Sequence, residues 1–102
     1  MRVTETDHAE PSEMVPFPNY RVNFWEKRSP ECSWSLDAYV LLDVAEINEV
    51  LDWAREHANA RPYEVFAEFD DEEIHELATP RTTPLIRLFG EDPNDPNSKY
   101  NA

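Results

Sequence analysis

The chain has 102 residues and a formal net charge of −13, from twenty-two carboxylates against nine lysines and arginines. This length suffices for one domain with a single hydrophobic core and is too short for two. A protein this acidic repels nucleic acid and anionic membrane surfaces and attracts basic protein surfaces, so direct binding of DNA, RNA or lipid is not expected.

The cellular compartment follows from segments that the sequence lacks. No apolar run approaches the ~20 residues of a membrane span, and no basic and then apolar leader resembles a signal peptide. The single cysteine, Cys32, can form neither an internal disulfide nor a multi-cysteine zinc site. We therefore expect a soluble cytoplasmic protein.

Composition divides the chain into three parts. Residues 1–19 are polar, contain three prolines and show no sustained periodicity, which predicts a disordered or loosely packed N-terminal arm. Residues 20–90 carry the periodic segments of an α+β domain. Residues 91–102 contain Asp-Pro and Asn-rich turns and predict a flexible C-terminal tail.

Two alternating segments predict a first hairpin. Residues 20–26 and 34–42 alternate as strands, and a loop containing Pro30 separates them. We expect one face to hold Tyr20, Val22 and Phe24 of the first strand with Trp34, Leu36, Ala38, Val40 and Leu42 of the second. The second face would then hold Trp25, Asp37, Tyr39 and Leu41.

A helix is predicted over about residues 43–59. Asp43 as N-cap and Glu46 three residues later form a capping box, and the flanking Leu42 and Ile47 form a hydrophobic staple. An apolar stripe recurs at helical spacing and requires a surface to pack on, whereas charged residues occupy the other side. The stripe is Ile47, Val50, Leu51, Ala54 and Ala58, and the charged side is Glu49, Asp52, Arg55 and Glu56.

Two further strands complete the predicted fold. Residues 63–69 alternate, and residues 85–89 precede Gly90, the only glycine. The connection between these strands is too polar for the core. The order ββαββ predicts a small α+β domain, with a four-stranded antiparallel or mixed sheet and one long helix on one face.

Catalytic and cofactor-binding patterns are missing. A phosphate-binding loop needs several glycines, and the three histidines, His8, His57 and His75, do not stand beside a serine or cysteine in a strained turn. The acidic run over residues 70–76 supplies oxygen ligands but lacks the spacing and turn glycine of a calcium loop. We expect no enzyme activity, cofactor or metal, and interpret the run as solvated surface.

Aromatic and acidic residues coincide on the predicted sheet face away from the helix, on the helix's outer side and after the third strand. Residues 36–76 hold thirteen acidic and two basic side chains, so most of the net charge lies on these elements. Aromatic anchors within a charged rim are typical of protein-binding surfaces. The candidate partner-binding residues are Trp25, Asp37, Tyr39, Glu49, Asp52, Trp53, Glu56, Glu64, Phe66, Glu68, Asp70 and Asp71, with Trp53 expected to be half exposed.

The function we expect is that of a small acidic module that inhibits or masks a basic, nucleic-acid-handling protein. An immunity protein, an antitoxin or a phage-type inhibitor would act in this way. The alternative is a non-catalytic structural or regulatory subunit that homodimerises through its sheet. The N-terminal arm could instead cover the aromatic face with Val15 and Phe17, and the acidity could reflect base composition or a salt-adapted cytoplasm. A small-molecule pocket between helix and sheet is a weaker alternative.

Overall fold

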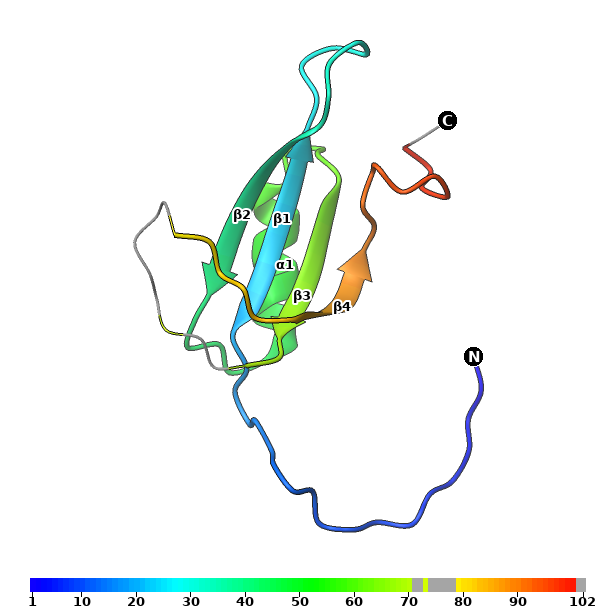
Figure 1. Cartoon of the computed structure of the whole chain (residues 1–102), viewed down its shortest axis with the longest axis vertical. Coiled ribbons are helices and arrows are strands. Elements are labelled where there is room, and N and C mark those ends of the chain that lie inside the picture. Colours follow the sequence, from blue (N-terminus) through cyan, green and yellow to red (C-terminus); the bar gives the residue numbers. More distant parts are fainter. Residues whose placement is uncertain (71–72, 74–78, 101–102) are drawn as a thin grey trace.

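The computed structural model describes residues 1–70, 73 and 79–100. Four strands form one antiparallel sheet in the order β2-β1-β3-β4, and one helix packs against one face of it (Figure 1). The predicted α+β fold and the ββαββ order are confirmed. The elements are β1 (Tyr20–Glu26), β2 (Ser35–Leu41), α1 (Ile47–His57), β3 (Tyr63–Glu68) and β4 (Leu85–Gly90).

β1 is a central strand with a partner on each side. It pairs antiparallel with β2, Val22 opposite Tyr39, and antiparallel with β3, Val22 opposite Val65. The expected hairpin of β1 with β2 is present, and β3 pairs antiparallel with β4. Because β2 and β3 flank β1, the chain crosses β1 through α1 to pass from one to the other. No helix in the described part of the chain is long and apolar enough to cross a membrane.

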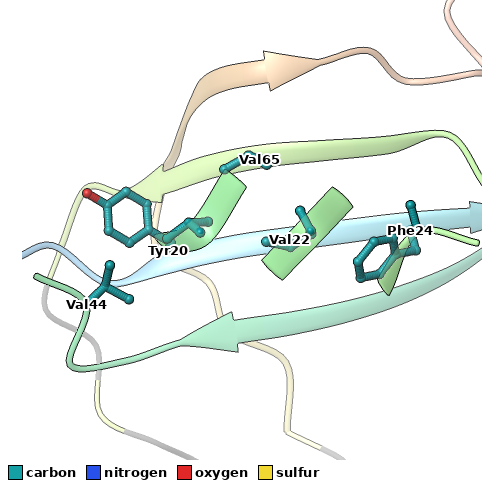
Figure 2. Packing of buried hydrophobic residues seen from close by; sticks show 8 residues of the cluster. Tyr20, Val22, Phe24, Val44 and Val65 are labelled. Carbon is teal, nitrogen blue, oxygen red and sulfur yellow. The ribbon is translucent and has the colours of Figure 1, made fainter. Parts of the chain in front are cut away.

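The core lies between β1, β3 and α1. Val22, Phe24, Val50, Ala54 and Val65 are at most 1% exposed. Figure 2 shows alternate side chains of β1 on the same side of the strand, with Val65 of β3 close to Val22. Burying one such valine or phenylalanine contributes roughly 1.5–3 kcal/mol relative to leaving it exposed, so this small cluster is the main support of the fold.

α1 begins three residues later than expected, with Glu46 and not Asp43 as its N-cap. Asp43 has a φ of 54°, outside helical geometry, and the first helical residue is Ile47. The carboxylate of Glu49 accepts hydrogen bonds from the backbone N–H groups of Glu46 and Ala45, at 3.1 and 2.9 Å. The capping interaction of Glu46 and Glu49 therefore replaces the one predicted for Asp43 and Glu46, because the sequence contains an acidic pair at both spacings.

The predicted hydrophobic staple is also wrong. Leu42 and Ile47 are both exposed, whereas Val44 is buried in the core cluster. The left-handed turn at Asp43 takes the chain out of β2 and brings Val44 to the sheet. The apolar stripe of α1 is confirmed at its centre, since Val50, Ala54 and Ala58 are buried and Leu51 packs against the cluster.

β2 turns the face opposite to the expected one toward α1. Tyr39 lies opposite Val22, and its ring centroid is 5.5 Å from that of Trp53 on α1, whereas Leu36 belongs to the other face and is 46% exposed. The sequence contains apolar residues at both phases of this segment, so alternation alone does not choose between them. The pairing with β1 decides the matter.

A bulge in β4 changes which of its residues share a face. Ile86 lies opposite Ala67, and Phe89 lies opposite Val65, with Leu88 as the additional residue. Ala67 and Val65 both belong to the helix side of the sheet. Ile86 and Phe89 are therefore on the same face although three residues separate them, which regular alternation would not allow.

Gly90 ends β4 in a conformation that other residues rarely adopt. Its φ is 86°, and a Cβ at this position would collide with the carbonyl oxygen of Tyr63. The only glycine of the chain thus permits both a left-handed turn and the close approach of two backbones.

Candidate protein-binding site

The sheet divides the predicted partner-binding residues between its two faces. Asp37 and Tyr39 of β2 lie on the helix side, where Tyr39 meets Trp53 of α1. A second group, Trp25, Glu64, Phe66 and Glu68, lies on the opposite face, which we call the far face. A third group, Glu49, Asp52 and Glu56, is exposed on α1; Asp70 is exposed after β3, and Asp71 lies outside the described residues. The structure thus moves Asp37 and Tyr39 from the expected sheet face, away from the helix, to the helix side, because β2 pairs with β1 in that register.

On the helix side, rings from three elements form a contiguous group. Tyr39 meets Trp53 edge to face at 5.5 Å, and the imidazole of His57 stacks on Trp53 at 4.4 Å and 25°. Phe24 lies beneath, with its centroid 5.8 Å from both Tyr39 and Trp53. Trp53 is half-buried, as expected, and Tyr39 is 46% exposed. We call Tyr39, Trp53 and His57 the aromatic edge.

Acidic side chains border the aromatic edge along α1. Glu49 and Glu56 stand four residues before and three residues after Trp53, which places them on the same side of the helix. Both are exposed. Asp52 is exposed as well, but its carboxylate is 3.0 Å from the guanidinium of Arg55. A half-buried tryptophan flanked by two carboxylates is therefore presented to solvent.

Arg61 joins the end of α1 to β2, a role that its position in a short break did not predict. Its guanidinium donates to the carbonyl oxygens of His57 and Ala58, each at 2.9 Å, and to the carboxylate of Asp37 at 3.1 Å. It also lies 4.6 Å from the centroid of Phe24. Arg61 thus caps the helix C-terminus and pairs with Asp37 below the aromatic edge. A basic residue just after a helix end was the available sequence signal.

The far face buries a carboxylate between two arginines. Glu68 is 4% exposed, and its two oxygens accept hydrogen bonds at 2.8 Å from Arg21 of β1 and from Arg81. Burial alone would raise the pKa of Glu68, but the hydrogen bonds and charges of Arg81 and Arg21 outweigh it and hold this pKa below its usual value. Glu68 is therefore ionised and already paired within the protein.

Glu64 is paired in the same manner. It is 2% exposed, accepts a hydrogen bond from the indole N–H of Trp25 at 2.5 Å, and lies 2.7 Å from the guanidinium of Arg87. That guanidinium also lies over the ring of Phe66 at 4.9 Å. The alternating carboxylates of β3 thus point into a network of arginines and rings rather than into solvent, which sequence alternation could not show.

The segment before β4 contributes to the far face, contrary to the expectation that the whole connection is too polar for burial. It crosses the sheet on the side away from α1 (Figure 1). Thr83 is buried and accepts a hydrogen bond from the backbone N–H of Asp70, and the N–H of Phe69 donates to the carbonyl of Pro84.

Val15 and Phe17 of the N-terminal arm are exposed, so these two residues do not cover the far face.

Lowering the pH should reduce the free energy of unfolding, because it protonates Glu68. Because its pKa is lowered in the folded state, the ion pairs contribute stability above the unfolded-state pKa, near 4.5, and lose it as pH falls through the folded pKa. We expect Glu68→Gln to lower the free energy of unfolding at neutral pH and to converge with the wild type as the pH falls through the lowered pKa of Glu68 in the folded state. Urea denaturation from neutral to acid pH measures the free energy of unfolding of both proteins. A difference between them that stays constant with pH would contradict a stabilising, ionised Glu68.

Metal ligands do not gather in the part of the chain that the structure describes. No group of three histidine, cysteine, aspartate or glutamate side chains is arranged there to hold an ion. Most of the acidic run over residues 70–76 lies outside the described residues.

The chain matches no protein-family model, no curated protein and no solved structure.

Proposed function

We propose that this protein is a small acidic binding module that inhibits or masks a basic, nucleic-acid-handling protein. An immunity protein, an antitoxin or a phage-type inhibitor has this role. The observation that supports the proposal is the exposed aromatic edge with Glu49 and Glu56 of α1 beside it. Aromatic anchors with an acidic border suit a partner whose surface is basic.

Binding would proceed in two physical steps. The net charge of −13 attracts a basic partner over several ångströms, and the carboxylates of α1 orient it. Tyr39 and Trp53 then lose their remaining exposure against the partner, which supplies most of the affinity. A basic cleft covered in this way could no longer accept a phosphate backbone.

The contact surface in this proposal is narrower than the one expected from the sequence. Glu64 and Glu68 are buried and paired with arginines, so they add little to an exposed acidic surface. Glu56 and Asp52 of α1 are exposed to a partner instead, whereas the exposed carboxylate of Glu49 also caps the helix. The far face contributes to binding only through the rigidity of the sheet beneath the aromatic edge.

A charge-reversal pair tests the proposal. We expect Asp52→Lys with Glu56→Lys to reduce capture of the basic partner from an extract of the source cells at least about tenfold, a loss of about 1.4 kcal/mol. Glu49 is left in place because its carboxylate caps α1. Capture by the wild type should also fall between about 50 and 300 mM salt, because screening shortens the range of the attraction.

The matched control is Glu5→Lys with Glu10→Lys, which changes the net charge equally in the exposed N-terminal arm. This variant should retain most of the capture. Equal loss in both variants would show that net charge alone is responsible. Unchanged capture in the α1 variant would reject α1 as the contact.

A further inference from the structure

We propose that β4 pairs antiparallel with β4 of a second copy of this chain, so that two four-stranded sheets join into one continuous sheet. The proposal concerns the edge of the sheet and is independent of the aromatic edge. It rests on the exposure of β4, on the distribution of carboxylates, and on the bulge that aligns two apolar side chains.

β4 is an edge strand with exposed apolar residues. In the order β2-β1-β3-β4 it pairs only with β3 among the described strands, so its other side presents backbone N–H and carbonyl groups outward. Ile86, Leu88 and Phe89 are 49%, 47% and 47% exposed. A strand of this kind is a template for pairing with another strand.

The other edge, β2, is protected in a way that β4 is not. β2 carries Asp37, whose carboxylate remains 57% exposed although it pairs with Arg61, and an exposed carboxylate on an edge strand opposes pairing with a second copy of an acidic chain. The only charged residue of β4 is Arg87, whose guanidinium is engaged by Glu64 and lies over Phe66. Pairing at β4 therefore brings no unpaired charge of the strand itself into an interface.

The charge distribution indicates that the occupant is a second copy. Residues 77–90 form the longest stretch without a carboxylate in a chain of net charge −13. Two copies of so acidic a protein repel each other over most of their surface, and this repulsion is weakest where carboxylates are absent. A two-fold axis at the middle of β4 brings the carboxylate-free strands Leu85–Gly90 of the two copies against each other.

The bulge sets the register of the proposed pair. With the two-fold axis between Arg87 and Leu88, Ile86 of one copy lies opposite Phe89 of the second copy, and the same contact occurs twice. Both residues belong to the helix side of the sheet, so they meet on the same face. The two copies of α1 then lie on one face of the joined sheet, on either side of these apolar pairs.

A gatekeeper substitution tests the interface. We expect wild-type protein to dimerise reversibly in sedimentation equilibrium, with an association constant that increases with salt because repulsion between the acidic copies is screened. Leu88→Lys should reduce association at least about tenfold. Leu36→Lys, on the other edge at nearly equal exposure, is the matched control and should associate like the wild type.

Cross-linking tests the register. In a Cys32→Ser background, mixing Ile86→Cys protein with an equal amount of Phe89→Cys protein should produce a disulfide-linked heterodimer well in excess of the twofold ratio to each homodimer that random pairing gives. A monomer at all concentrations, equal loss in Leu88→Lys and Leu36→Lys, or no excess of the heterodimer would overturn the proposal. The opposite salt dependence separates it from the proposed binding of a basic protein.

Discussion

Replacing Phe24 with alanine is expected to destabilise the protein by about 3–5 kcal/mol, a large share of the 5–15 kcal/mol that holds a typical domain folded. Phe24 is 1% exposed and is the largest fully buried side chain among the residues that the structure describes. Its ring contacts those of Tyr39, Trp53 and Tyr63, with centroids 5.8 to 6.0 Å apart. The substitution leaves a cavity that three neighbouring rings cannot fill without moving.

Urea denaturation followed by circular dichroism measures this effect. Phe69→Ala is the matched control, because the same atoms are removed from a side chain that is 62% exposed. We expect the control to change the free energy of unfolding by less than about 1 kcal/mol. Equal effects of the two substitutions would mean that Phe24 is not the centre of the core.

Glu68→Ala is expected to cost a further large amount, about 3–5 kcal/mol, for an electrostatic reason. Removing the carboxylate leaves Arg21 and Arg81, whose side chains are 14% and 10% exposed, without their shared partner. The two guanidinium groups would then repel each other on the far face. Glu56→Ala, which removes an exposed carboxylate from α1, is the control and should have little effect.

A triple variant separates the cost of an unpaired charge from the value of the network. When Arg21→Met, Glu68→Leu and Arg81→Met are combined, no buried charge remains without a partner, and such replacements are often neutral or stabilising. We expect the triple variant to recover most of the stability lost in Glu68→Ala. A triple variant no more stable than Glu68→Ala would show that the ion pairs themselves stabilise the fold.

Strand β1 illustrates what local pattern can predict. Tyr20, Val22 and Phe24 alternate with more polar residues, and the structure confirms both the limits of this strand and its buried face. β2 lacks that contrast, since Leu36 and Tyr39 are of opposite phase and both are apolar. Its predicted face was wrong because pairing with β1, and not its own composition, sets its orientation.

The candidate site was predictable only in part for a related reason. The amphipathic pattern of α1 placed Trp53 at the edge of the apolar stripe, and the structure confirms that it is half-buried. Glu64 and Glu68 are buried because they pair with arginines that are distant in the sequence. Arg21 and Glu68 are 47 residues apart, and no periodicity within β3 reports such a contact.

The sequence by itself determined the number and order of elements and the amphipathic helix, because periodicity and turn residues act over a few neighbouring positions. Only the tertiary structure decided the strand order, the face of β2 and the pairing of the β3 carboxylates. These depend on register and on contacts between distant segments. The acidic residues of the chain are therefore found in two different settings. Some are exposed beside Trp53 on α1, and Glu68 is buried in ion pairs beneath the segment that precedes β4.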